Sequence, residues 1–451
     1  MPDNSNNLDL EKLVSLCKRR GFIFQSSEIY GGLASTWDYG PLGVELKRNV
    51  KESWWRKLVL RRDDMVGLDS AILMHPEVWK SSGHVESFSD PLVECVDCHK
   101  RWREDLIQSL GDTPDNCQEC NGNLTAPRMF NLMFKTFMGP VADEANVVHL
   151  RPETAQGIFV NFSNVVTTTR KRPPFGIAQI GKAFRNEITT GNFIYRTREF
   201  EMMEIEFFVP PGTDDEWHQS WVNESLKWYT DLGIQKAHLK IREHASEELA
   251  HYSKATSDIE YKFPWGWGEI QGTANRTNFD LLAHSGSSGQ SLSYFDEQSG
   301  EHKVPYVIEP SFGVDRALMA FLTDAYREEE APSSSGKMEK RVFLKLDHSL
   351  APVKVAVLPL SRNEKLVPLA KEVHSKIRSS ETVGGLVQYD DTQSIGKRYR
   401  RQDEIGTPLC VTVDFDSLDD DEVTIRERDS MNQTRVPIST LVESVHKLTQ
   451  Y

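Results

Sequence analysis

The stretch FRNEITTGNFIYRTREFEMMEIEFF (184–208) joins two strand-like segments that carry many charges of both signs. Alternate side chains of a strand share a face, so Phe200, Glu204 and Glu206 point the same way, while Arg185 lies near the end of the first segment. An aromatic ring can stack on a base, an arginine can pair with a phosphate, and carboxylates can hold an ammonium group. The alternative is an exposed hairpin with solvated ion pairs. The flanking apolar residues favour burial, and buried charges need partners or ligands.

Three further charged residues lie in equally apolar settings. Glu153 stands at the expected start of a helix, where a negative charge is favourable, Glu309 ends the apolar run VPYVI, and Arg316 opens a helix after SFGVD. Each alone could be an ordinary cap or ion pair. Together they form a set of acids and arginines at strand ends, which indicates a ligand site.

Four of the six cysteines form two pairs with the spacing Cys95-x2-Cys98-x18-Cys117-x2-Cys120. This spacing is typical of a Zn²⁺ site, because each CxxC turn presents two thiolates and two turns complete a tetrahedron. Four such ligands leave no open coordination position, so the expected role is structural and not catalytic. His99 could replace one cysteine, and four unrelated buried cysteines are the alternative.

Apolar periodicity indicates the elements that must position these side chains. Helices are expected over 8–20, 44–60, 154–169 and 214–232, strands over 65–76, 130–134, 146–153, 174–187 and 198–209, and strand with turn over 263–281. The strand at 65–76 is expected to end at Pro76, since proline cannot continue a ladder. Residues 304–330 predict a buried strand, a bend at a glycine and a helix. The strand-rich centre favours an α+β fold with a mostly antiparallel sheet and packed helices.

The pattern changes after residues 331–340 (APSSSGKMEK), which are expected to form a flexible surface loop or linker. From residue 353 onward strand-like and helical segments alternate. This alternation predicts a separate parallel or mixed α/β domain of about 100 residues.

The chain has 451 residues, too many for one core, so two or three domains are expected. Its formal charge of −14 excludes binding of polyanions through bulk charge, so a nucleic-acid surface must be local. The best candidates are the basic residues at 396–401 (GKRYRR), Arg426 and Arg428, with an amphipathic helix face as the alternative. No run is apolar enough to span a membrane, and the polar, acidic N-terminus argues against a targeting peptide, so a cytoplasmic protein is expected.

Several of these strings resemble one known family. FRNE with REFEMMEIEFF resembles motif 2 of the class II aminoacyl-tRNA synthetases, and FGVDRALMAFL resembles their motif 3. The helix at 44–60, with the following strand and Pro76, resembles motif 1, the dimerisation element. More narrowly, DYGPLG, SSGHVESFSDP, LRPETAQGIF, GIAQIGKAFRNEI and EPSFGVDR resemble the homodimeric glycyl-tRNA synthetases, and the similarity spans nearly the whole chain.

The resemblance implies a class II catalytic domain with a six-stranded antiparallel sheet and flanking helices, an insertion, and a C-terminal α/β anticodon-binding domain. The corresponding ranges are 1–92 and 128–346 for the catalytic domain, 93–127 for a zinc-knuckle-like insertion and 347–451 for the anticodon-binding domain. It also implies a homodimer. The Zn²⁺ prediction rests on the cysteine spacing alone, because the family varies in its insertions at this point.

The resemblance assigns ATP binding to six side chains: Arg185, Glu187, Arg196, Phe200, Glu269 and Arg316. Arg185 would hold the α-phosphate and the substrate carboxylate, Glu187 would contact the adenine amino group, and Arg196 would reach the terminal phosphates. Phe200 would stack on the adenine, with Arg316 on its other side. Glu269 stands where the family places a ligand of Mg²⁺. The predicted catalytic residues are Arg185, Arg316 and Glu269.

The ammonium of glycine would lie among Glu153, Glu204 and Glu309, with Ser311 near its α-carbon. In the implied reaction the carboxylate of glycine attacks the α-phosphorus of ATP, and the terminal ribose hydroxyl of tRNA(Gly) then attacks the glycyl-adenylate. The carboxylate is already a nucleophile, so catalysis is positioning and charge neutralisation. A crowded pocket rejects larger amino acids by clash, and no editing domain is expected because nothing smaller competes.

Two other functions remain open. A non-catalytic synthetase-like protein that binds nucleic acid would lack the motif arginines and the acidic pocket, whereas Arg185, Glu187, Phe200 and Arg316 are all present. An adenylating enzyme that acts on free glycine without tRNA would not need the C-terminal domain.

Overall fold

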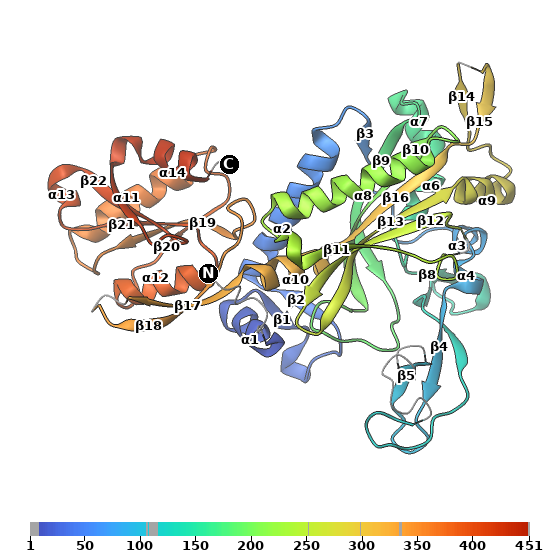
Figure 1. Ribbon diagram of the computed structural model, residues 1–451, viewed down its shortest axis with the longest axis horizontal. Coiled ribbons are helices and arrows are strands. Elements are labelled where there is room, and N and C mark those ends of the chain that lie inside the picture. Colours follow the sequence, from blue (N-terminus) through green and yellow to red (C-terminus); the bar gives the residue numbers. More distant parts are fainter. Residues whose placement is uncertain are drawn as a thin grey trace.

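The computed structural model describes residues 9–104, 107, 116–250, 252–297, 299–332 and 336–449. Figure 1 shows a larger unit built around one twisted sheet, a smaller C-terminal unit, and an arm that projects from the larger unit. Residues 1–8 and most of 105–115, on which parts of the predicted catalytic domain and insertion fall, lie outside the described residues.

The larger unit contains a seven-stranded sheet with the order β11-β12-β13-β16-β10-β9-β3. Its strands are β11 (Leu239–Glu243), β12 (Ala255–Phe263), β13 (Gly266–Thr277), β16 (Tyr306–Gly313), β10 (Glu199–Val209), β9 (Phe175–Phe184) and β3 (Met65–Gly67). The first six pair in antiparallel fashion, as predicted. The expected count of six is one too low, because β3 adds a short edge strand that runs parallel to β9.

Helices cover both faces of this sheet, namely α2 (Pro41–Trp55), α8 (Asp214–Asp231) and α10 (Val314–Ala325) on one side and α6 (Ala155–Val160), α7 (Phe162–Thr169) and α9 (Phe279–Ser288) on the other. β10 alternates between the two layers. Met203 and Phe207 pack with the first group of helices, and Phe208 packs with the second. Glu204 and Glu206 share the side of Phe208. The charged strand is therefore buried on both faces, which excludes the interpretation as a solvated hairpin.

Two expected elements are wrong. The strand at 65–76 stops at Gly67, and Pro76 begins α3 (Pro76–Ser81), where its missing N–H is not needed and His75 accepts a hydrogen bond from the backbone of Glu77. Half of 331–340 is strand and not linker, because β17 (Tyr326–Pro332) and β18 (Met338–Leu344) form a hairpin with the cross-strand ion pair Arg341–Glu329 (2.6 Å). Residues 333–335 lie outside the described residues.

The arm consists of β4 (Ser89–Glu94), β5 (Arg101–Arg103) and β6 (Arg128–Asn131), in the order β5-β4-β6. It carries the cysteine pairs between its strands. Because β4 pairs with β6, this small sheet extends beyond both ends of the range 93–127 expected for the insertion.

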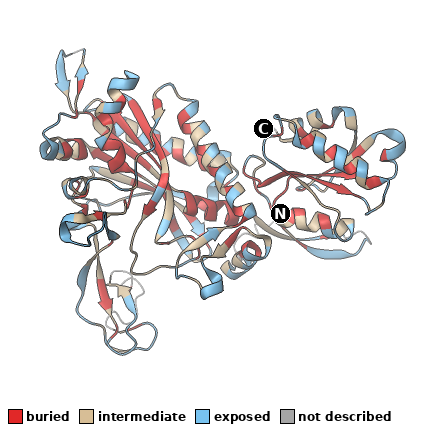
Figure 2. Cartoon of the chain, turned by 180° about the vertical axis from the view of Figure 1, so that it is seen from behind, coloured by how far each residue is buried: buried red, intermediate tan, exposed pale blue. Residues whose placement is uncertain are grey.

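The C-terminal unit contains a five-stranded sheet in the order β20-β19-β21-β22-β23. Its elements are β19 (Val353–Pro359), α11 (Leu366–Arg378), β20 (Leu386–Tyr389), α12 (Ile395–Glu404), β21 (Leu409–Val413), β22 (Glu422–Glu427), β23 (Gln433–Pro437) and α14 (Leu441–Thr449). β19 runs parallel to β20 and β21, whereas the last two strands are antiparallel, so the predicted mixed α/β alternation is confirmed. Figure 2 shows that buried residues follow the sheets of both units.

Candidate active site

A cavity of about 160 Å³ lies where β9 and β16 end and β10 begins. It is lined by all six side chains predicted to bind ATP, namely Arg185, Glu187, Arg196, Phe200, Glu269 and Arg316, and also by Ser311. The strand expected over 174–187 would include Arg185 and Glu187, but β9 ends at Phe184. The backbone turns there, with Glu187 N–H donating to the carbonyl of Arg185 (2.7 Å), and both side chains still reach the cavity.

Arg316, in the first turn of α10, is oriented by several contacts. Its Nη1 lies 3.1 Å from Oε2 of Glu269, and its Nε donates to the carbonyl of Tyr195 (3.2 Å). The guanidinium lies 4.6 Å from the centre of the Tyr195 ring. Burial alone would raise the pKa of Glu269, but the charges of Arg316, Arg185 and Arg196 leave that pKa lowered. The cavity therefore presents an ionised carboxylate beside a fixed guanidinium.

Arg185 lies across the cavity beside an aromatic ring. Its guanidinium is 5.4 Å from the centre of the Phe200 ring, and its Nε donates to the carbonyl of Pro152 (3.1 Å). Arg196 Nη1 lies 3.9 Å from Oε2 of Glu187. With Arg316, three guanidinium groups and one aromatic ring converge on a single space, which is the chemistry required to hold polyphosphate and a base.

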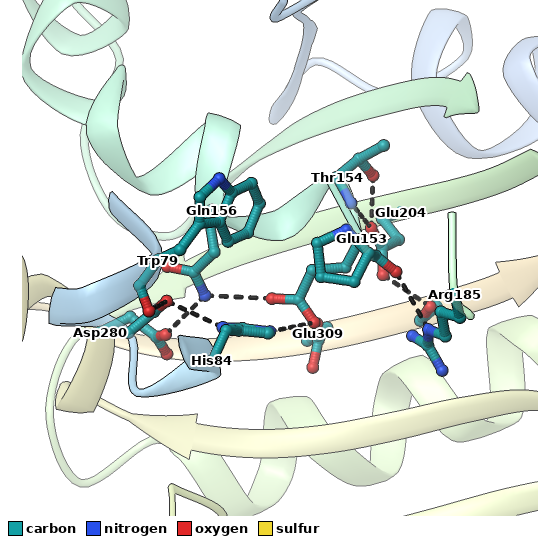
Figure 3. A network of polar contacts seen from close by, with 12 residues as sticks. Trp79, His84, Glu153, Thr154, Gln156, Arg185, Glu204, Asp280 and Glu309 are labelled. Atoms are coloured by element: carbon teal, nitrogen blue, oxygen red, sulfur yellow. Dashed lines mark hydrogen bonds and ion pairs between the residues drawn. The ribbon is translucent and has the colours of Figure 1, made fainter. Parts of the chain in front are cut away.

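A buried cluster of acids adjoins this cavity (Figure 3). Glu204 is 1% exposed. Its Oε1 accepts a hydrogen bond from the Ser311 hydroxyl (2.8 Å), and its Oε2 accepts from the backbone N–H (2.7 Å) and the hydroxyl of Thr154. Burial and the charge of Glu153 raise the pKa of Glu204, while these hydrogen bonds oppose the shift. Ser311 touches both compartments and connects the cavity to the acids.

Glu153, just before α6, is the second acid of the cluster. Its Oε2 lies 3.4 Å from Nε2 of His84, and its Oε1 accepts from Nε2 of Gln156 (3.1 Å), which also donates to Asp280 (3.0 Å), as Figure 3 shows. Burial would raise the pKa of Glu153, but the neighbouring His84 and then Arg276 lower it. This carboxylate therefore remains ionised inside the protein.

Glu309, on β16, is the third acid. Its Oε2 accepts from Nη1 of Arg276 (2.9 Å), and the same guanidinium donates to both oxygens of Asp280 (2.8 Å each). Burial raises the pKa of Glu309 to about 8; Arg276 opposes this shift, and the charges of Glu204 and Glu153 add to it. All four residues predicted to bind glycine are thus brought to one buried compartment.

Several residues of this site escaped prediction: Thr154, Gln156, Tyr195, Arg276, Asp280 and His84. The only sequence signal for Arg276 and Asp280 is their i, i+4 spacing, which is common on solvated helices. Glu201, which had no predicted role, lies on the opposite face of β10 and pairs with Lys47 (3.2 Å) and Lys51 (2.7 Å) of α2. It supports the hairpin from behind the site.

The four cysteines Cys95, Cys98, Cys117 and Cys120 meet at one point of the arm, where their sulfur atoms all lie within 4.8 Å of one another. The Sγ atoms of Cys95 and Cys120 are 3.5 Å apart, as are those of Cys98 and Cys117. Backbone N–H groups of Cys98 and Glu119 point at sulfurs (3.5 Å each), as in a metal knuckle. This arrangement excludes four unrelated buried cysteines.

The basic candidates of the C-terminal unit divide into two groups. Arg426 and Arg428 are 6% and 2% exposed; Arg426 pairs with Asp403 (2.9 Å), and Arg428 donates to the carbonyl of Gly406 (2.8 Å). Arg428 therefore has a structural role, and its prediction as a nucleic-acid contact is wrong. Lys397 and Arg400, within 396–401, line a groove of about 850 Å³, and Arg426 also lines this groove.

Comparisons with known proteins identify the class of protein to which this architecture belongs. A family model described as "tRNA synthetase class II core domain (G, H, P, S and T)" matches residues 137–326, and one described as "Anticodon binding domain" matches residues 354–448. The seven-stranded core with its arginine-lined cavity, followed by this domain, defines a class II aminoacyl-tRNA synthetase.

Curated relatives identify the branch of that class. The chain is 57% identical to the "Glycine--tRNA ligase" of Cutibacterium acnes over 453 residues (96% of this chain, 95% of the relative) and 57% identical to that of Thermobifida fusca over 445 residues (95% and 96%). It is 55% identical to the protein of the same name from Streptomyces coelicolor over 448 residues (96% and 96%). The chain therefore belongs to the glycine–tRNA ligase family, as its motifs predicted. None of these names supports the alternative of a non-catalytic nucleic-acid-binding protein.

The helices provide one further comparison with the sequence predictions. Within the described part of the chain, no helix is both long enough and apolar enough to cross a bilayer.

Proposed function

We propose that this chain activates glycine with ATP to glycyl-adenylate and transfers the glycyl group to the 3′ end of tRNA(Gly). One observation carries the proposal: the arginine-lined cavity and the buried acids meet at Ser311, which lines the cavity and donates to Glu204 (2.8 Å). An α-phosphate held by Arg185 and a glycine held by the acids would be neighbours, and such proximity supplies much of the catalysis in a phosphoryl-type transfer.

In the first step, the carboxylate of glycine attacks the α-phosphorus of ATP and pyrophosphate leaves. Arg185 would neutralise the α-phosphate, and Arg196 and Arg316 would neutralise the phosphates that depart. Phe200 would stack on the adenine, and Glu187 would accept a hydrogen bond from the adenine amino group. Glu269 fits a ligand of Mg²⁺, because it is a partly exposed carboxylate with a lowered pKa at the rim of the cavity. The bound ion would offset the charge of the leaving pyrophosphate.

The choice of amino acid would follow from burial and charge. Glu153, Glu204 and Glu309 would surround the ammonium, and Ser311 would lie beside the α-carbon. Each of these acids is already packed and at most 8% exposed, so an added methyl group would have to displace protein atoms. We propose that the enzyme needs no editing domain, because no smaller amino acid competes.

For the second step we propose that residues 347–451 bind the anticodon region of tRNA and that 1–92 with 128–346 form the catalytic domain. The groove beside α12 supports this role, since Lys397 and Arg400 line it together with Arg20 of α1 (Leu10–Arg20). The terminal 3′-hydroxyl of tRNA would attack the adenylate in the Arg185 cavity.

We propose that Cys95, Cys98, Cys117 and Cys120 hold a structural Zn²⁺ in the insertion at 93–127. Tetrahedral Zn²⁺ with Zn–S bonds of about 2.3 Å requires sulfurs roughly 3.8 Å apart, which the 3.5 Å separations fit. The ion would fold the end of the arm, which has few apolar side chains of its own.

We also propose a cytoplasmic homodimer, as the resemblance of α2 to motif 1 implies. Exposed apolar side chains near α2 support an intersubunit surface: Ile29 is 88% exposed, Tyr30 87% and Leu33 60%. Sedimentation of the purified chain tests this state, and a monomer at micromolar concentration would contradict it.

Glycine-dependent ATP–pyrophosphate exchange tests the activation step. Exchange is expected with glycine and not with alanine or serine, and Glu204→Gln should weaken it. Glu199→Gln provides the matched control, since Glu199 lies on the same strand but pairs with Lys182 at the surface. Absence of exchange with pure protein would contradict the proposed enzyme. Exchange without charging of tRNA would favour an adenylating enzyme that acts on free glycine.

A further inference from the structure

One carboxyl group in the acid cluster has no role in the proposed reaction. Glu206 is 0% exposed, and neither of its oxygens has a hydrogen-bond partner among the residues that the structure describes. It lies on the same face of β10 as Glu204, one alternation further from Phe200 and the ATP cavity. Glu206 is therefore a buried acid that lies further from the ATP cavity than Glu204.

The strand register brings Glu206 opposite Glu309. β10 and β16 pair Glu204 with Ser311 and Phe207 with Ile308, so the same register, continued across the two intervening residues, places Glu206 opposite Glu309. Side chains directly opposite on antiparallel strands have Cβ atoms about 5 Å apart, within reach of a hydrogen bond between two carboxyl groups.

The charged groups around this pair decide the protonation state of Glu206. Arg276 approaches from β13, Asp280 from α9, Glu204 from β10 and Glu153 from the start of α6, while β9 presents the apolar Ile177 beside Glu206. Arg276 is already engaged by Asp280 and Glu309. An ionised carboxylate without a partner is strongly unfavourable in such a place, whereas a neutral acid avoids most of that cost. Burial, and then the charge of Glu309, raise the pKa of Glu206 well above its usual range.

We infer that Glu206 is a positioning residue that stays a neutral carboxylic acid and donates its hydroxyl to the carboxylate of Glu309 when that carboxylate holds the ammonium of glycine. This inference rests on the proposed glycine pocket. Glu309 has two oxygens, and Arg276 takes one of them (2.9 Å). A donor on the far side would fix the carboxylate in one orientation toward the substrate without adding another negative charge to the pocket. Glu206 would touch Glu309 and not glycine itself.

Two substitutions at Glu206 test whether this side chain acts as a hydrogen-bond donor, as a charged ligand or only as a group that fills space. The amide of Glu206→Gln keeps the size and can still donate, whereas Glu206→Met keeps the approximate size and cannot donate. In glycine-dependent ATP–pyrophosphate exchange we expect E206Q to hold the KM for glycine within about threefold. E206M should raise it by about 10- to 100-fold with little change in kcat, as expected for the loss of a hydrogen bond to a charged group. Glu199→Gln, on the exposed part of β10, is the control.

Each other result overturns the inference. If E206Q raises the KM for glycine 100-fold or more, Glu206 is an ionised ligand of the ammonium. If E206M behaves like the wild type, Glu206 only fills space. Should E206M fail to fold, the infrared carbonyl band of protonated carboxylic acids at pH 7 decides: E206Q must lose intensity there relative to the wild type, and an unchanged band refutes the neutral acid. Glu309→Gln tests the proposed glycine pocket separately from the role of Glu206. An unchanged KM for glycine in that variant would refute the proposed pocket itself.

Discussion

Replacing Arg276 with methionine should destabilise the catalytic unit strongly. The guanidinium is 2% exposed, donates to both oxygens of Asp280 (2.8 Å each) and to Glu309 (2.9 Å), and lies 3.9 Å from the centre of the Tyr252 ring. Methionine keeps much of the apolar volume but removes every donor. Two buried carboxylates then lose their common partner.

The magnitude follows from the cost of an uncompensated buried charge. Removing one member of a buried ion pair costs about 3–5 kcal/mol, and the two pairs share one guanidinium, so their costs are not additive. We expect the free energy of unfolding to fall by about 3–5 kcal/mol at pH 7. The variant should pay this penalty by binding protons in the folded state. Unfolded carboxyl groups titrate near pH 4, whereas the buried acids of the folded variant bind protons at a higher pH, so the penalty should grow as the pH rises from about 4 and should be larger at pH 7 than at pH 5.

Urea unfolding followed by tryptophan fluorescence at pH 7 and at pH 5 measures both the size of the lost stability and the direction in which it changes with pH. The difference between wild type and R276M should be smaller at pH 5. Arg172→Met is the matched control, because Arg172 forms one ion pair, with Glu297 (2.6 Å), in which both side chains are 62% exposed. A loss of unfolding free energy of less than about 1 kcal/mol for R276M, or a loss that does not shrink on acidification, would contradict the reasoning. Arg276 would then not be the group that neutralises the buried carboxylates of Asp280 and Glu309.

Three further outcomes are expected. Burial raises the pKa of Glu309 to about 8, and the ammonium of glycine requires the ionised carboxylate, so the KM for glycine should fall about tenfold per unit as the pH rises from 6 toward 8. This slope should disappear in Glu309→Gln, and a flat wild-type profile would contradict the assignment. Arg316→Lys should lower ATP-dependent exchange at least about 100-fold, since lysine cannot both lie on the Tyr195 ring and pair with Glu269; an effect below about fivefold would contradict the role. Elemental analysis should find one equivalent of zinc in the wild type and in Cys410→Ser, which lies away from the arm, but none in Cys117→Ser.

The faces of the core strands were predictable because alternate side chains of a strand share a face. In 198–209 the two faces assigned on this basis are the faces observed, with Met203 and Phe207 in one layer and Glu204 beside Phe208 in the other. Glu153, Glu309 and Arg316 were recognisable because each is a charged residue at the end of a strand or the start of a helix in an apolar setting. Their proximity followed only from the family resemblance, since strand register joins residues more than 100 positions apart.

The errors have local physical causes. Pro76 reads as a strand end from sequence, but proline is equally suited to the first turn of a helix, and His75 decides the choice by capping Glu77 N–H. The polar run 331–340 resembles a linker because half of its hairpin is solvated. What folds it is Arg341, which is buried between Glu329 and Asp403 (2.8 Å) of α12, a partner that local composition does not show.

The charges of the 184–208 hairpin are compatible with folding because they are divided among three environments. Glu199 pairs with Lys182 at the surface, Glu201 pairs with two lysines of α2, and Glu204 and Glu206 are buried in the compartment that we propose for glycine. Only the last environment has fewer cations than acids, since Arg276 pairs with both Asp280 and Glu309. A compartment that holds more acids than cations binds an ammonium group in preference to a neutral molecule of the same size. The lack of space around the acids then restricts the choice to the smallest amino acid, so charge selects the functional group and packing selects glycine.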